Sequence, residues 1–201
     1  MQEEKLRLED LLESSTSAND DDRINNVAII GAGIMGRGIA QTVASMGLEV
    51  VIVEVDSEKL ENAKTKLNDN IDSEIKRWAM TKSDKKAIFS RIKWETDINA
   101  IKDCEIIIEA VQEDFDEKVK VFRQIDKIAN PEAIFVSNTS TLSLTNISES
   151  ISRPTKVIGM HFLNPVPKVP MVELVKSLHT SNETVLKVKE FASRIGKTPV
   201  E

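Results

Sequence analysis

The feature that most constrains the fold is a glycine-rich segment that directly follows a short apolar run. Residues 27–30 (VAII) have the length and composition of a buried strand, and Gly31, Gly33 and Gly36 follow with the spacing G-x-G-x-x-G. Gly31 permits a tight turn, Gly33 lets a phosphate approach the backbone, and Gly36 allows the next helix to pack closely. Residues 34–46 then predict a helix whose unpaired first amides hold negative phosphates. The unit is typical of dinucleotide-binding loops.

From Asn25 onward the chain alternates short apolar runs with longer amphipathic segments. The apolar runs predict seven more strands, at residues 50–53, 92–94, 105–108, 134–136, 157–160, 171–175 and 198–200. The amphipathic segments predict further helices, at residues 57–80, 83–91, 115–129, 144–148 and 183–195. This alternation indicates one α/β domain over residues 25–201, a Rossmann-like and mostly parallel sheet with helices on both faces.

Polar side chains gather immediately after the predicted strands. They occupy residues 31–36, 54, 109–113, 137–140 and 161–164. Ligands of open α/β sheets bind outside the carboxyl ends of the strands, and those ends share one edge of the sheet. The sequence therefore predicts a single site at that edge.

Glu54 bears on the choice of dinucleotide. It stands 18 residues beyond Gly36, at the end of the second predicted strand, where a carboxylate accepts hydrogen bonds from both ribose hydroxyls. A carboxylate repels a 2′-phosphate, and the next residues, Val55, Asp56 and Ser57, include no arginine to hold one. We assign Asp56 to the cap of the following helix. NAD is therefore expected rather than NADP.

Composition excludes several other classes of protein. The 201 residues carry a net charge of −6, which argues against nucleic-acid binding. One cysteine (Cys104) and two histidines are too few for a zinc cluster, so no metal is expected, and nothing points to an oxidising compartment. The longest apolar run is broken by Arg37 and falls short of the roughly 18 residues that a membrane helix needs. We expect a cytoplasmic protein. The chain has no tyrosine, which excludes any dehydrogenase mechanism that needs a tyrosine acid.

Residues 1–24 differ in character from the rest of the chain. They hold eight acidic and three basic residues, a net charge of −5, whereas the remainder is close to neutral. The segment is too acidic for a secretory signal or a mitochondrial transit peptide. Its composition predicts a disordered extension. A short docking helix is the alternative, with an apolar side formed by Leu6, Leu8, Leu11 and Leu12.

Four segments carry a resemblance to a known family: GAGIMGRGIAQ, IIIEAVQED, SNTSTLSLT and HFLNPVPKVPMVELV, in this order. Together they resemble the NAD-binding domain of the 3-hydroxyacyl-CoA dehydrogenase family, over about residues 25–201. The resemblance implies oxidation of an (S)-3-hydroxyacyl-CoA to the 3-ketoacyl-CoA, with NAD as hydride acceptor. The acyl-CoA is then the binding partner.

The resemblance also implies residue roles. His161 is the general base, Glu173 pairs with it, and Ser140 binds the substrate hydroxyl. The implied cofactor contacts are the loop and four other residues: Gly31, Ala32, Gly33, Ile34, Met35, Gly36, Glu54, Glu113, Lys118 and Asn164. A coenzyme A tail also needs cations and a groove. We therefore expect its phosphates to meet basic residues of the long helix after Glu54, with Asn70 nearby: Lys64, Lys66, Lys76 and Arg77.

The chemistry of these residues agrees with the implied roles. Removal of hydride from C3 requires the C3 hydroxyl to lose its proton, and imidazole is suited to accept a proton at neutral pH. A proline-rich loop over residues 164–170 allows the sixth and seventh strands to lie side by side, with Glu173 near His161. A core position is the structural alternative for His161.

Several of these site residues could instead have a purely structural role. The SNTST segment around Ser140 is also a plausible helix-capping turn. Lys118 and the basic residues near Arg77 are also what an ordinary solvated helix face carries. Arg37 replaces the small residue that the family commonly has there, and it either reaches the pyrophosphate or points to solvent.

The family continues past this region into a helical domain that completes the substrate cleft and forms the dimer. The chain stops where that domain should begin, so we expect a truncated enzyme that binds NAD, turns over poorly and forms a homodimer only with that domain. Two other functions stay open: a dehydrogenase of a small sugar acid, and a dinucleotide-binding module without catalysis.

Overall fold

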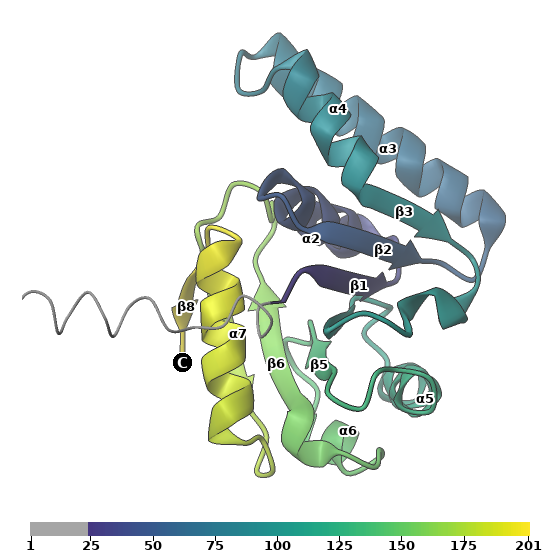
Figure 1. Ribbon diagram of the computed structural model, residues 1–201, viewed down its shortest axis with the longest axis vertical. Coiled ribbons are helices and arrows are strands. Elements are labelled where there is room, and N and C mark those ends of the chain that lie inside the picture. Colours follow the sequence, from purple (N-terminus) through teal and green to yellow (C-terminus); the bar gives the residue numbers. More distant parts are fainter. Residues whose placement is uncertain (1–23) are drawn as a thin grey trace, which may run out of the picture.

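The computed structural model describes residues 24–201, in which eight strands form one sheet (Figure 1). Their order is β3-β2-β1-β4-β5-β6-β7-β8. The strands are β1 (Asn26–Ile30), β2 (Glu49–Val53), β3 (Ile92–Glu95), β4 (Ile106–Glu109), β5 (Ile134–Ser137), β6 (Val157–Phe162), β7 (Met171–Lys176) and β8 (Thr198–Val200). Strands β1 to β6 are parallel, whereas β7 runs antiparallel to β6 and parallel to β8. The predicted mostly parallel sheet is confirmed.

Six α-helices of the described part pack on the two faces of this sheet. They are α2 (Ile34–Ser45), α3 (Ser57–Lys76), α4 (Lys82–Arg91), α5 (Phe115–Asp126), α6 (Leu144–Ser148) and α7 (Asn182–Arg194). Alternate residues of β1 divide between two cores: Val27 and Ile29 pack with α2, α3, α4 and α7, whereas Ala28 and Ile30 pack with α5 and α6. The central strands β1, β4, β5 and β6 are therefore buried on both faces, which is why their sequences are nearly continuous apolar runs.

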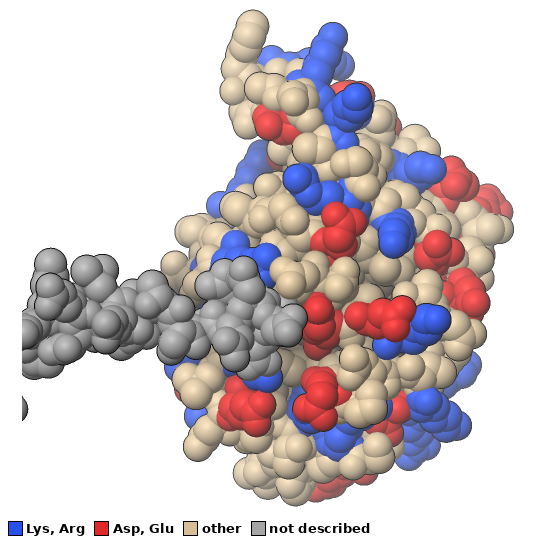
Figure 2. Space-filling model, viewed as in Figure 1, with Lys and Arg blue, Asp and Glu red and all other residues tan. Residues whose placement is uncertain are grey.

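The hairpin of α3 and α4 departs from expectation. The helix predicted over residues 57–80 ends at Lys76, and Trp78 follows with φ +60°. Asp56 caps the start of α3, where its carboxylate accepts from the amides of Glu58 (2.8 Å) and Lys59 (3.0 Å). The assignment of Asp56 to a helix cap is thus confirmed. On the face shown in Figure 2, both signs of charge are interspersed, and basic side chains are prominent at the α3–α4 end.

Strand order reverses at β1, whose neighbours are β2 on one side and β4 on the other. One edge of the sheet carries the carboxyl ends of five parallel strands: β1, β2, β4, β5 and β6. The polar residues of the predicted site lie at this edge. The acidic extension predicted over residues 1–24 lies, apart from Ile24, outside the described residues. In the described part, no helix combines the length and apolar character needed to cross a membrane.

The three glycines of the loop have different surroundings. A Cβ on Gly36 would lie 1.9 Å from the carbonyl oxygen of Gly31, and Gly31 itself has φ +100° and lies against Ala110. A Cβ on Gly33 would meet no atom within 4 Å. Gly36 therefore serves the packing of α2 on β1, and Gly31 allows the loop to lie against the segment after β4. Gly33 leaves open space in front of the helix start.

This difference predicts that two matched glycine-to-alanine substitutions affect thermal stability unequally. Gly36→Ala should cost about 3 kcal/mol and lower the Tm by roughly 6–12 °C, because the overlap with Gly31 outweighs the better helix propensity of alanine. Gly33→Ala, the control, should leave the Tm within about 2 °C of the unsubstituted chain. Thermal unfolding followed by circular dichroism measures both, and equal Tm values for the two variants would contradict the packing role of Gly36.

Candidate active site

The start of α2 has the properties of a phosphate-binding loop. Gly33 is its N-cap, and no side chain there accepts from the first amides of the helix. Those amides carry partial positive charge and face the open space left by the absent Cβ. Glu54, just past the end of β2, lies beside the loop and accepts from the amide of Ala32 at 3.2 Å. The loop and Glu54 together fit the diphosphate and a ribose of a dinucleotide.

His161 and Glu173 face each other across the antiparallel pair of β6 and β7. The imidazole Nδ1 lies 2.8 Å from Oε2 of Glu173, and a quarter of the His161 side chain is exposed. A carboxylate at Nδ1 favours the tautomer with its proton on that nitrogen, which leaves the lone pair of Nε2 free to accept a proton. His161 is therefore not a fully buried core histidine, the structural alternative considered for it.

A pocket of about 320 Å³ lies at the carboxyl edge beside this pair. Five of the predicted site residues line it together: Met35 from the glycine loop, Glu113, Ser140, His161 and Asn164. The other lining residues are Ala110, Val111, Asn138, Phe162 and Leu163. Segments after β1, β4, β5 and β6 thus converge on one cavity.

Glu113 organises the turn that carries Ser140. Its Oε1 accepts from the hydroxyls of Thr139 and Thr141 and from the amide of Ser140 at 3.2 Å. Partial burial acts to raise the pKa of Glu113, but the hydrogen bond from Thr139 and the charge of Lys118 outweigh it, so the pKa lies below its usual value. Glu113 is therefore a carboxylate at neutral pH and fixes the turn in place.

Lys118 lies in a buried charge network that sequence reasoning missed. Its side chain is 1% exposed, and its ammonium lies 2.6 Å from Glu109 and 3.2 Å from Glu113. Glu109 is wholly buried and also accepts from the Ser137 hydroxyl (2.7 Å). The solvated-face interpretation of Lys118 is therefore wrong. The sequence does contain a signal for this ion pair: Glu109 ends an otherwise apolar strand, and Lys118 follows nine residues later.

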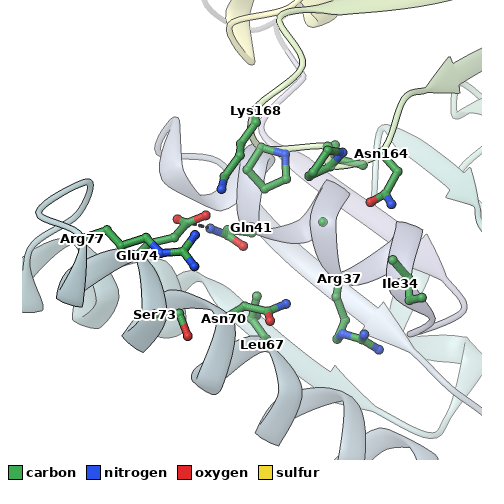
Figure 3. Close-up of a pocket in the computed structure, with 14 residues that line it drawn as sticks. Ile34, Arg37, Gln41, Leu67, Asn70, Ser73, Glu74, Arg77, Asn164 and Lys168 are labelled. Carbon is green, nitrogen blue, oxygen red and sulfur yellow. Dashed lines mark hydrogen bonds between the residues drawn. The ribbon is translucent and has the colours of Figure 1, made fainter.

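A second cavity, of about 370 Å³, lies between α2, α3 and the loop after β6 (Figure 3). Asn70 and Arg77 line it, as does Lys168, which sequence reasoning did not single out. Of the other basic residues predicted to act with Arg77, none is among the lining residues: Lys64, Lys66 and Lys76. Asn164 lines both cavities, so the two adjoin at that residue.

The loop that separates the cavities is held by a buried ammonium. Lys197 donates to the carbonyl oxygens of Val166 and Val169, and burial lowers the pKa of this lysine. On the other side, Gly38 of α2 approaches so closely that a Cβ would lie 3.0 Å from the Cβ of Val166. The loop is therefore packed against α2 rather than free in solvent.

The second histidine, His179, and the one cysteine, Cys104, lie away from this edge. His179 pairs with Glu149 (3.0 Å) beyond the end of β7, at the opposite edge of the sheet. Cys104 is buried, which raises the pKa of its thiol to about 12. Residues 24–201 contain no group of three or more histidine, cysteine or acidic side chains arranged to hold a metal ion.

The buried network predicts a large effect of Lys118→Met. This change leaves the Glu109 and Glu113 carboxylates without their shared cation, which should cost about 3–5 kcal/mol of unfolding free energy. Urea denaturation measures it, with Lys120→Met on the exposed side of α5 as a control expected within about 0.5 kcal/mol of the unsubstituted chain. Addition of Glu109→Gln should recover part of the loss. Equal stability of Lys118→Met and its control would refute the assignment.

Comparison with known proteins agrees with this geometry. Residues 26–201 match the family described as 3-hydroxyacyl-CoA dehydrogenase, NAD binding domain. The chain is 38% identical over 178 residues to a probable 3-hydroxybutyryl-CoA dehydrogenase of Bacillus subtilis, covering 89% of this chain and 62% of that protein. It is 35% identical over 174 residues to the 3-hydroxybutyryl-CoA dehydrogenase of Bradyrhizobium diazoefficiens, covering 87% and 59%.

A solved structure shows the same arrangement. The crystal structure of (S)-3-hydroxybutyryl-CoA dehydrogenase from Ralstonia eutropha superposes with a TM-score of 0.86 at 40% identity, covering 88% of this chain and 62% of that one. The chain thus spans about three fifths of the length of these relatives. With its family match, its glycine loop and its sheet, the chain belongs to the NAD-binding domains of the 3-hydroxyacyl-CoA dehydrogenase family, and NAD is the family's cofactor.

Proposed function

We propose that this chain is the cofactor-binding part of an NAD-dependent (S)-3-hydroxyacyl-CoA dehydrogenase and carries its catalytic base. The observation that carries the proposal is the His161–Glu173 pair, which borders a pocket shared with the glycine loop and Ser140. A proton acceptor thus adjoins the loop that binds the cofactor. A further domain, as in the longer relatives, is proposed to complete the substrate cleft and to form the homodimer; the enzyme is proposed to act in the cytoplasm.

In the proposed mechanism, bound NAD supplies the acceptor for the hydride that leaves C3 of the substrate. Nε2 of His161 takes the proton of the C3 hydroxyl, and the Glu173 carboxylate, 2.8 Å from Nδ1, stabilises the imidazolium that forms. The Ser140 hydroxyl donates a hydrogen bond to the same substrate oxygen. The Glu113 carboxylate positions Ser140 through its amide.

The cofactor is proposed to lie along the carboxyl edge from Glu54 to His161. The amides after Gly33 hold the diphosphate, and Glu54 accepts from ribose hydroxyls. The negative charge of Glu54 disfavours the extra phosphate of NADP. Lys118 is proposed to act through Glu113 rather than by its own contact with NAD, because both its neighbours are carboxylates and it is buried.

The second cavity supports an acyl-CoA as the substrate class. A coenzyme A thioester has an apolar reactive end and a distant anionic end. The pocket beside His161 and the cavity lined by Asn70, Arg77 and Lys168 adjoin at Asn164, so one extended ligand spans both. A small sugar acid has no part to place in the second cavity.

The catalytic role predicts a selective loss in His161→Gln. The chain is first joined to the remaining domain of the Bacillus subtilis relative, and oxidation of (S)-3-hydroxybutyryl-CoA is followed by NADH absorbance. The kcat should fall by about 10²–10⁴-fold, because glutamine cannot accept the proton. NADH binding to the 201-residue chain, measured by fluorescence, should change less than about twofold. The matched control is His179→Gln, at the opposite edge, for which full activity is expected; an active His161→Gln variant would remove His161 as the base.

A further inference from the structure

Arg37 is a cation that lines the second cavity and has no role in the proposed mechanism. It lies on the first turns of α2, one turn after Ile34, on the face that looks toward α3. Figure 3 shows it at the Ile34 end of the cavity, with Arg77 and Lys168 toward the other end. Neither interpretation of Arg37 from the sequence anticipated a position between α2 and α3.

The guanidinium of Arg37 is only partly satisfied by the protein. One terminal nitrogen, Nη1, donates to the carbonyl oxygen of Ala32 at 3.0 Å, which ties the side chain to the glycine loop. Nε is buried and has no hydrogen-bond partner. Burial also lowers the pKa of Arg37, with no nearby carboxylate acting against it. A buried donor left unpaired costs about 1–3 kcal/mol, so this geometry favours a ligand that supplies the missing acceptor.

The surroundings select the chemistry of that ligand. Three cations line the cavity, Arg37, Arg77 and Lys168, against one carboxylate, Glu74. Glu74 already accepts from the side-chain amide of Gln41 at 3.1 Å. The planar guanidinium group matches the oxygens of a phosphate, which it binds through two parallel hydrogen bonds. An anion with phosphate groups therefore fits this cavity.

We propose that Arg37 is a specificity-determining residue that binds a phosphate group of the ligand in the α2–α3 cavity. The inference rests on the proposed function, in which that ligand is the coenzyme A part of the substrate. The diphosphate of the cofactor is the other source of the same chemistry, because the Arg37 side chain is anchored to the glycine loop at Ala32. The cavity favours coenzyme A, since its other cations, Arg77 and Lys168, come from α3 and the loop after β6 rather than from the glycine loop.

Calorimetric titration of the 201-residue chain separates the two sources. The probes are coenzyme A, pantetheine, which lacks the phosphates, and NADH. Arg37→Met should weaken coenzyme A binding at least tenfold and change NADH and pantetheine binding less than about twofold. Lys59→Met, which removes an exposed cation of α3 that does not line the cavity, is the matched control and should leave all three affinities unchanged.

The remaining outcomes overturn the proposal in distinguishable ways. Weakened NADH binding in Arg37→Met with unchanged coenzyme A binding would assign the guanidinium to the cofactor. Unchanged affinities for both would remove Arg37 from ligand binding. An unsubstituted chain that binds NADH but not coenzyme A would overturn this inference alone, whereas failure to bind NADH would overturn the proposed function.

Thermal unfolding supplies a second readout. Arg37→Met removes the unpaired donor, so the Tm of the free chain should stay the same or rise. A fall of more than about 4 °C would show that Arg37 serves the fold instead.

Discussion

The antiparallel register between β6 and β7 is the constraint on which the proposed site depends. It sets His161 opposite Glu173, and a slip of one residue would turn the carboxylate to the other face of the sheet. Contacts at both ends hold this register. Lys197 binds two carbonyls of the loop that joins the strands, and at the far end Thr180 donates to the Val157 carbonyl at 2.6 Å. The imidazole is thus aligned by contacts remote from it.

A second constraint is an ion-pair network at the carboxyl ends of β4 and β5. Glu109 and Glu113 share the ammonium of Lys118, which connects β4, α5 and the turn after β5. Lys118 and Glu109 are buried, so each of these two charges is costly without the other, and the half-exposed Glu113 links them to the turn after β5. The position of the Ser140 amide follows from that arrangement, and with it one wall of the pocket.

The local features of the fold were predictable because they leave periodic or steric signals. Apolar runs located the central strands β1, β4, β5 and β6, since strands buried on both faces must be apolar throughout. The outer strands β3, β7 and β8 are partly exposed and gave weaker signals. The glycine spacing located the start of α2, because Gly31 and Gly36 pack too closely for side chains. The family predicted from four motifs is confirmed by the match over residues 26–201.

The features that sequence missed depend on contacts between distant segments. The end of α3 at Lys76 had no stop signal, since Trp78 occupies the left-handed position that glycine usually fills. Lys118 resembled any solvated lysine because its partner Glu109 is on another element. The second cavity joins α2, α3 and the loop after β6, so neither Arg37 nor Lys168 could be placed in it from spacing.

The two histidines permit the most direct test of the proposed crevice, because one lies at each edge of the sheet. The 201-residue chain is prepared with isotope-labelled histidine, and imidazole NMR signals are recorded as NADH is added, with binding verified by fluorescence. If cofactor and base share the carboxyl edge, the His161 signals shift in proportion to occupancy and those of His179 stay in place. If bound NADH leaves His161 unchanged, or shifts only His179, the cofactor does not lie beside the proposed base.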